Sequence, residues 1–230
     1  MILLAVVAAV IWGLWAAFSV SVIDVGASKE IDAAKIESET RQLVAASWSR
    51  QSLLVADTGE LETALLAKDP AVASAQITKS WPHTLNVRVV PKVPTLIWIS
   101  GSDQYVLDGE GTVIGRPDPG VKLPTVVDDN NLPIKVGDKP VGLDFVTFVA
   151  DFNAGLSKAS GIVATSFELK ESVSELYVKT GSGFELILDT SRGAGDELQD
   201  LSVLMGYLNK QHKKPTQYID LRVPERAYYK

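Results

Sequence analysis

The sequence predicts an α+β protein with an N-terminal transmembrane helix, a small α+β domain and a larger, β-rich α+β domain. Three observations predict this class. Residues 1–23 carry no charged side chain, and all 22 basic and 28 acidic residues of the 230-residue chain lie after them. Beyond this segment, short apolar runs with strand-like alternation recur between a few longer runs with helical spacing. Two prolines, Pro91 and Pro94, divide those runs into two groups.

Residues 1–23 have the length and polarity of a membrane-spanning helix. At about 1.5 Å per residue the segment extends about 34 Å, and the hydrocarbon core of a bilayer is about 30 Å thick. Trp12, Trp15 and Phe18 suit an interfacial aromatic anchor. The alternatives are a buried core helix and a signal peptide cleaved near Phe18. Signal peptides usually have about 7–15 apolar residues behind a basic start, and this run is longer and lacks that start.

Charge does not decide the orientation of this segment. No basic residue precedes it, whereas Lys29, Lys35 and Arg41 follow it, so the positive-inside rule read literally favours a cytoplasmic body. A chain that starts directly in an apolar run indicates a missing upstream flank. We therefore expect a short basic cytoplasmic stretch before this segment, which an in-frame stop codon just before Met1 would contradict.

Residues 24–91 are predicted to form a compact α+β unit, whose first strand begins earlier, at residue 19. Ser28 is the expected cap of the first helix, Asp57 begins the second with Glu60 three residues on, and Pro70 ends it. The last strand alternates apolar and polar residues, as a half-buried strand does. The expected elements are a strand, a helix, a short apolar run, a helix and two strands, at 19–26, 31–44, 53–55, 57–69, 72–78 and 85–90.

Residues 92–230 predict a larger unit in which strands outnumber helices. The expected strands and short apolar runs are 95–99, 104–107, 112–114, 123–127, 167–170, 175–180, 184–188 and a final strand region at 217–229. Two helices, 143–156 and 195–209, each carry one apolar stripe that would cover the sheet.

The composition disfavours several functional classes. The chain has no cysteine and two histidines, which excludes a thiolate nucleophile and Cys-ligated metal sites. Its net charge of −6 argues against nucleic acid as a partner. The acidic runs 108–111 and 128–131 lack the ligand pattern of an EF-hand, and 192–195 lacks the ending of a phosphate-binding loop. We expect no enzyme, no catalytic residue, no metal, no cofactor and no small-molecule substrate.

Four motifs in one order make the chain similar to the bacterial FtsQ/DivIB cell-division family. They are ITKSWPHTLNVRV at 77–89, YVLDGEGTV at 105–113, LPTV at 123–126 and YIDLRVP at 218–224. The first resembles the end of the family's POTRA domain, in which a Trp-Pro or Phe-Pro turn precedes Thr-Leu-x-Ile/Val-x-Val. The chain departs from the family pattern at Pro91 and Lys92, where the family has Glu-Arg. It also departs in its missing cytoplasmic start and in a tail that stops at Lys230.

The resemblance implies a transmembrane helix at 1–23, a POTRA domain at 24–91 and an FtsQ/DivIB-type β domain at 92–230. It further implies a non-enzymatic, single-pass scaffold of the cytoplasmic (inner) membrane, with its C-terminal body extracytoplasmic and located at the division septum. The implied partners are the bilayer and the single-span division proteins FtsB/DivIC and FtsL, with no nucleic acid.

The last strand region is the expected partner-binding site. A chain-terminal strand at a sheet edge leaves main-chain N–H and C=O groups to which a partner strand can add, while side chains give specificity. Ile219 and Leu221 are expected to pack in the core instead, and Pro224 would interrupt the pairing. The predicted partner-binding residues are Tyr218, Asp220, Arg222, Val223, Glu225, Tyr228 and Tyr229.

Two other functions are open alternatives to the division scaffold. A POTRA-bearing component of polypeptide transport or secretion would usually contain several POTRA units or a β-barrel, whereas this sequence predicts one such unit. A membrane-anchored cell-wall hydrolase would need a carboxylate pair, a zinc site or a Ser/Lys set, and no such arrangement stands out in the sequence.

Overall fold

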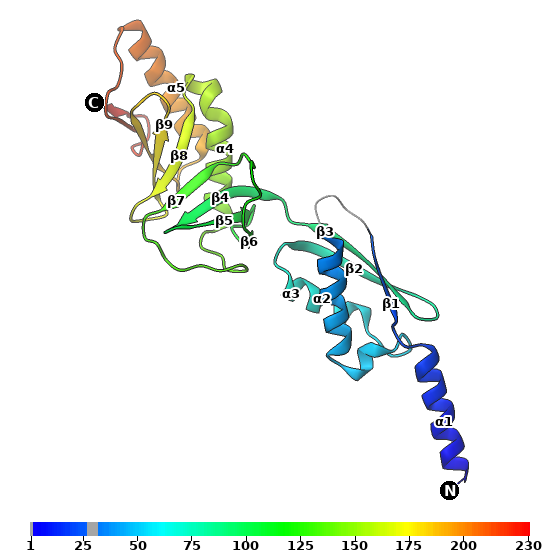
Figure 1. The fold of residues 1–230 in the computed structure, drawn as a ribbon. Helices are drawn as coiled ribbons and strands as arrows, with labels where there is room; N and C mark the ends of the chain where they lie inside the picture. The colour runs from blue at the N-terminus through cyan, green and yellow to red at the C-terminus, as the bar shows by residue number, and fades with distance from the viewer. Residues whose placement is uncertain (1, 27–31) are drawn as a thin grey trace. The chain divides into compact units, whose positions relative to one another are not determined.

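The computed structural model of the chain describes residues 2–26 and 32–230, which form two compact units, Met1–Lys92 and Val93–Lys230 (Figure 1). Each unit combines helices with its own β-sheet, so the α+β part of the prediction is confirmed. Ser28, the expected helix cap, lies outside the described residues.

Helix α1 (Ile2–Ala17) is shorter than the predicted transmembrane helix at 1–23, and its side chains are largely exposed. Its 16 residues extend about 24 Å at about 1.5 Å per residue, less than the about 30 Å of a bilayer core. Across residues 2–26 and 32–230, no helix combines the length and hydropathy that a membrane span requires. The transmembrane part of the predicted fold is therefore wrong.

The residues after α1 belong to the first unit rather than to a longer helix. The Val20 N–H donates to the Gln51 carbonyl at 2.8 Å, and the Leu53 N–H donates to the Phe18 carbonyl at 2.8 Å. Strand β1 (Val22–Val25) then enters the sheet. These main-chain bonds end the helix at Ala17, because a residue paired outside the helix cannot also continue its hydrogen-bond ladder.

The first unit is a three-stranded sheet in the order β1-β3-β2, packed with two helices. The central strand β3 (Thr84–Pro91) runs parallel to β1 and antiparallel to β2 (Val72–Ser80). Its alternation buries Leu85 and Val87 completely, as the sequence predicts. The remaining elements are α2 (Ala33–Ala45), the 3-10 helix η1 (Trp48–Gln51) and α3 (Thr58–Lys68).

Aspartates begin α2 and α3, the two helices that pack on this sheet. Asp32 caps α2 by accepting the N–H groups of Ala34 and Lys35 at 3.0 and 3.3 Å. Asp57, the predicted start of α3, accepts the N–H groups of Gly59 and Glu60 at 2.9 and 3.3 Å. Each side chain thus satisfies main-chain donors that lack a partner inside the helix.

The second unit is a nine-stranded mixed sheet in the order β12-β11-β10-β9-β8-β7-β4-β5-β6, in which β11 is Tyr218–Asp220 and β12 is Tyr228–Tyr229. Its strands up to the last helix are β4 (Pro94–Ser100), β5 (Asp103–Asp108), β6 (Val113–Gly115), β7 (Thr125–Asp128), β8 (Ala164–Leu169), β9 (Glu175–Thr180) and β10 (Glu185–Asp189). Helices α4 (Leu143–Ser160) and α5 (Ala194–Lys210) lie side by side on one face of the sheet (Figure 1).

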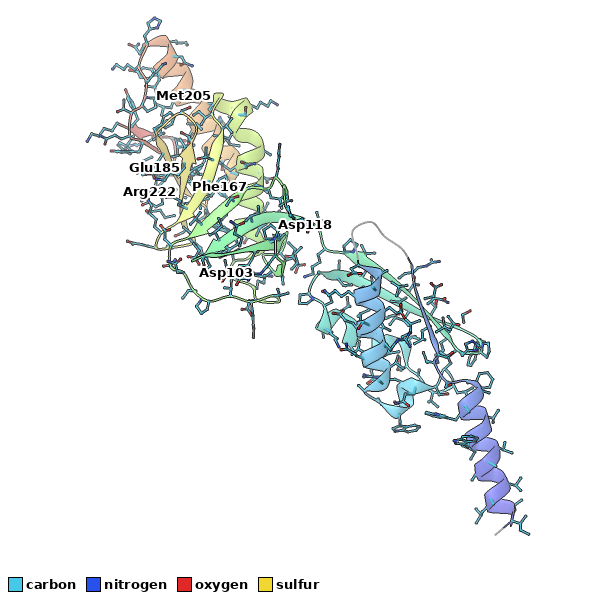
Figure 2. All side chains as sticks on the ribbon, in the orientation of Figure 1. Asp103, Asp118, Phe167, Glu185, Met205 and Arg222 are labelled. Carbon is cyan, nitrogen blue, oxygen red and sulfur yellow. The ribbon has the colours of Figure 1, made fainter. Side chains whose placement is uncertain are left out.

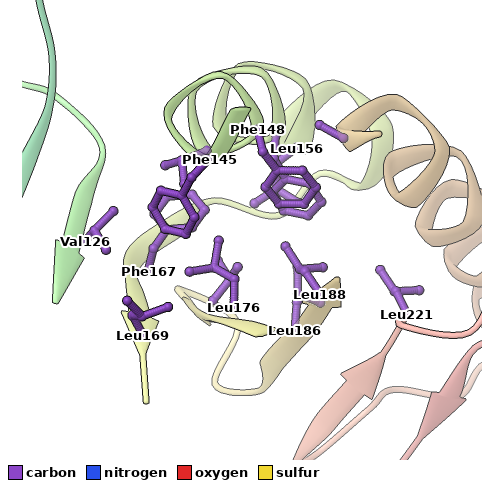
Figure 3. Close-up of a cluster of buried hydrophobic side chains, with 14 of the residues drawn as sticks. Val126, Phe145, Phe148, Leu156, Phe167, Leu169, Leu176, Leu186, Leu188 and Leu221 are labelled. Atoms are coloured by element: carbon purple, nitrogen blue, oxygen red, sulfur yellow. The ribbon is translucent and has the colours of Figure 1, made fainter. Parts of the chain in front are cut away.

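The core of the second unit lies between these two helices and the sheet (Figure 3). Phe145, Phe148 and Leu156 project from α4 toward apolar side chains of β8, β9 and β10. Leu221 contributes from the position directly after β11 and is fully buried with Ile219, as the sequence predicts. The predicted final strand region at 217–229 is two short strands separated by a loop.

Candidate partner-binding edge

Strand β12 (Tyr228–Tyr229) is the last strand on one side of the nine-stranded sheet. It pairs antiparallel with β11 (Tyr218–Asp220), which in turn lies parallel to β10. None of the described strands pairs with the outer side of β12. The C-terminal strand is therefore a sheet edge, which is the geometry that strand addition requires.

The main-chain groups of β12 alternate between β11 and the outside. The Lys230 N–H donates to the Tyr218 carbonyl at 3.1 Å, and its carbonyl accepts the Gln217 N–H at 2.7 Å. Because successive residues of an antiparallel strand point these groups in opposite directions, the N–H and C=O of Tyr229 face outward. Tyr229 thus presents one donor and one acceptor along the open edge.

The two tyrosines of β12 lie on opposite faces of the sheet. Tyr228 pairs with Asp220 and shares the face that lies away from the helices. Tyr229 pairs with Ile219, whose side chain is buried on the helix side. Their exposed fractions are 50% and 37%, so both retain apolar area that a partner could cover.

Arg222, labelled in Figure 2, is held by intramolecular ion pairs beside these strands. Its Nε and Nη2 donate to the two carboxylate oxygens of Asp220 at 3.0 and 2.7 Å, and Nη1 donates to Glu175. The hydrogen bonds from Arg222 lower the pKa of the Asp220 carboxyl. The charge of Arg222 is thus matched within this chain by Asp220 and Glu175.

The same carboxylate of Glu175 also orders a tyrosine on β9. Tyr177 donates its hydroxyl proton to Glu175, and this hydrogen bond, together with burial, raises the pKa of Tyr177 to about 12. The Lys170 ammonium lies 3.6 Å from the centre of the Tyr177 ring. On the face of the sheet away from the helices, the charged side chains next to β11 are therefore paired with one another.

The loop between β11 and β12 projects the remaining predicted site residues. Val223 is 42% exposed, and the Arg226 N–H donates to its carbonyl at 3.1 Å. Glu225 has a φ of 59°, the left-handed region that non-glycine residues rarely adopt. The structure thus brings Tyr218, Asp220 and Tyr228 together on paired strands, whereas Val223 and Glu225 lie on the adjoining loop.

A groove of about 440 Å³ adjoins this edge and was not predicted from the sequence. It lies between α5 and the residues before β12, and its exposed apolar lining is Val203 and Tyr207, with exposed fractions of 69% and 51%. The sequence contains a signal for this groove, because Val203 and Tyr207 lie off the apolar stripe of α5 formed by Leu201, Leu204 and Leu208. Large apolar residues on an outward helix face indicate a contact surface.

Comparisons with known proteins bear on the first unit and on much of the chain. Residues 18–90 match the family model described as "POTRA domain, FtsQ-type". The chain is also 24% identical, over 172 residues, to the cell division protein FtsQ of Chloroflexus aurantiacus, a match that covers 74% of this chain and 60% of the relative. The first unit therefore matches an FtsQ-type POTRA domain, and the two matches support the likeness to the FtsQ/DivIB family. The match spans about three fifths of the length of this relative.

The POTRA match begins at residue 18, inside the segment predicted to span a membrane. This start agrees with the observed hydrogen bonds of Phe18 and Val20 to the first unit. The family motif at 77–89 occupies β2, the turn at Trp81 and Pro82, and β3. It is therefore the hairpin that supplies two of the three POTRA strands, with Leu85 and Val87 in its core.

Proposed function

We propose that this FtsQ-like protein is a non-enzymatic scaffold of the bacterial division complex that acts at the septum. Its POTRA domain is 24–91 and its FtsQ/DivIB-type β domain is 92–230. In this proposal the β domain captures FtsB/DivIC-like and FtsL-like division proteins. Capture occurs at the β12 edge, through Tyr218, Asp220, Arg222, Val223, Glu225, Tyr228 and Tyr229.

The observation that carries this proposal is the open edge at β12. A partner strand that adds there would bond to the outward N–H and C=O of Tyr229, and main-chain bonds of this kind tolerate many partner sequences. The two-residue length of β12 limits uncontrolled pairing, as short edge strands do in other proteins. Specificity then has to come from the side chains around the strand.

The surroundings of β12 supply those side chains. On the helix side, the groove with Val203 and Tyr207 can receive an apolar residue of the partner next to Tyr229. On the loop, the 42% exposed side chain of Val223 adds further apolar area. Such a cluster of aromatic and aliphatic residues is typical of interface hot spots.

Binding of a purified FtsB/DivIC-like protein from the same organism tests the proposal. We expect Val223→Glu and Tyr229→Lys each to weaken binding by about tenfold or more, because each puts a charge into a contact that excludes water. Val136→Glu is the matched control, since Val136 is 46% exposed on a different loop. Equal binding of all three variants and the wild type would refute the site, and no binding by the wild type would refute the proposed partner.

A further inference from the structure

A buried polar cluster lies where the chain turns from β10 into α5. Arg192 is in this turn, and its side chain is only 14% exposed. Its Nη2 pairs with Asp200 of α5 at 2.7 Å, and its Nη1 lies 3.7 Å from Oε1 of Glu197. The Glu197 side chain is fully buried and accepts the Asp189 N–H at 2.8 Å.

Arg192 also bonds to a segment far away in the sequence. Its Nη1 donates to the main-chain carbonyl of Leu221. Leu221 is the last buried residue before the chain leaves the sheet, and its N–H donates to the Ile187 carbonyl at 2.9 Å. One guanidinium therefore ties the start of α5 to the point where the connection to β12 begins.

The connection itself has few other restraints among the described residues. Residues 223–226 are exposed, and the one main-chain hydrogen bond inside the loop joins Arg226 to Val223. β12 adds only two residues of pairing at the far end. The place and direction of the edge strand thus depend strongly on how the chain leaves Leu221, and two side chains act there: Arg222 on the open face and Arg192 on the helix side.

We propose that Arg192 is a positioning residue for the edge strand: by holding the Leu221 carbonyl it sets the path of residues 222–227 and so the register in which β12 meets a partner strand. The effect of Arg192 on partner binding rests on the proposed function. Its effect on the ordering of β12 concerns the free protein alone. Glu197 and Asp200 restrict the guanidinium, because Nη2 pairs with Asp200 while Nη1 lies between Glu197 and the Leu221 carbonyl.

Amide hydrogen exchange of the full chain, resolved at single residues, tests the inference. We expect Arg192→Met to accelerate exchange of the Lys230 N–H, which bonds to β11, by about tenfold. Exchange in the β9–β10 pair Val178 and Leu186 should not change. The variant should also dissociate about tenfold faster from the purified FtsB/DivIC-like protein, because an edge strand in the wrong position loses contacts that hold the complex.

Three further variants separate positioning from general stability. Asp200→Asn removes the ion pair but leaves the bond to Leu221, so it should have a smaller effect than Arg192→Met. Arg116→Met removes the exposed pair to Asp103, at 2.9 Å, and should have no effect. Arg192→Lys keeps the charge without the planar fork and should rescue binding in part; it also replaces Arg192→Met if that variant does not fold.

The outcomes distinguish this inference from the proposed function. Faster exchange confined to Lys230, with faster dissociation, supports the inference. Any one of four results would overturn it. These are unchanged exchange at Lys230, equal acceleration in β9 and β10, an Asp200→Asn effect as large as that of Arg192→Met, and normal binding despite faster exchange. If the wild type binds no division protein, the proposed function fails, and the exchange result alone still decides whether Arg192 orders β12.

Discussion

At the scale of single residues, Glu197 is the most unusual ionisable group of the second unit. Its side chain has no exposed surface, and Oε2 has no hydrogen-bond partner among the described residues. Burial raises the pKa of this carboxyl to about 8, against the lowering effect of the Asp189 N–H and of Arg192. The carboxylates of Asp189 and Asp200 act in the same direction as burial.

This raised pKa predicts how stability depends on pH. The unfolded carboxyl loses its proton near pH 4.5, whereas the folded one keeps it up to about pH 8, so the contribution of Glu197 to stability falls as pH rises between these values. Glu197→Gln keeps an acceptor for the Asp189 N–H and cannot ionise. We expect urea unfolding at pH 5, 6.5 and 8 to show a stability difference between the variant and the wild type. That difference should move in favour of the variant by at most about 1.4 kcal/mol per pH unit. Parallel pH profiles of the two proteins would contradict the prediction.

At the scale of elements, β12 illustrates how a two-residue strand can carry a function through its main chain. Tyr229→Pro removes the outward N–H, whereas the Lys230 N–H that bonds to β11 remains. We expect Tyr229→Pro to weaken binding of the FtsB/DivIC-like protein more than Tyr229→Ala does, by about three- to tenfold. Calorimetric titration measures the difference, which isolates the main-chain donor because both variants lack the aromatic ring. Equal affinities would show that the partner does not add as a strand.

The elements next to α1 also explain why the helix predicted at 1–23 is longer than the observed α1. Hydropathy extends without a charge to residue 23, but α1 ends at Ala17 because the following residues bond to Gln51 and Leu53 and then join β3. A composition-based reading does not distinguish apolar residues of a helix from apolar residues of an adjoining buried strand. The same ambiguity explains 53–55, where the apolar run is not a strand and Leu53 is a core residue of the first unit.

At the scale of the whole molecule, each of the two units has its own apolar core. Leu85 is fully buried in the first core and Phe152 in the second. We expect Leu85→Ala and Phe152→Ala each to destabilise by about 2–5 kcal/mol, with the loss confined to the mutated unit. Amide exchange checks this: β3 amides should respond to the first variant and β9 amides to the second. Uniform acceleration by either variant would show that the two cores unfold as one.

Most strands and all helices of the second unit follow from periodicity in the sequence. The alternation at 175–180 and the apolar stripe at 143–156 depend on neighbours close in the chain, and they correspond to β9 and α4. The edge position of β12 and the groove with Val203 were not derivable in this way. They depend on strand order and on how α5 packs, which involve residues far apart in the sequence.

The sequence by itself determined the α+β class, the positions of the core strands and the likeness to the FtsQ/DivIB family. Local periodicity and ordered motifs encode these features directly. Only the tertiary structure decided that the apolar N-terminal run ends as a helix at Ala17 and that Arg222 is neutralised by Asp220 and Glu175. It also placed Arg192 against the Leu221 carbonyl. Each of these outcomes results from a hydrogen bond or ion pair that a residue makes with a partner brought near by folding, which spacing along the chain does not specify.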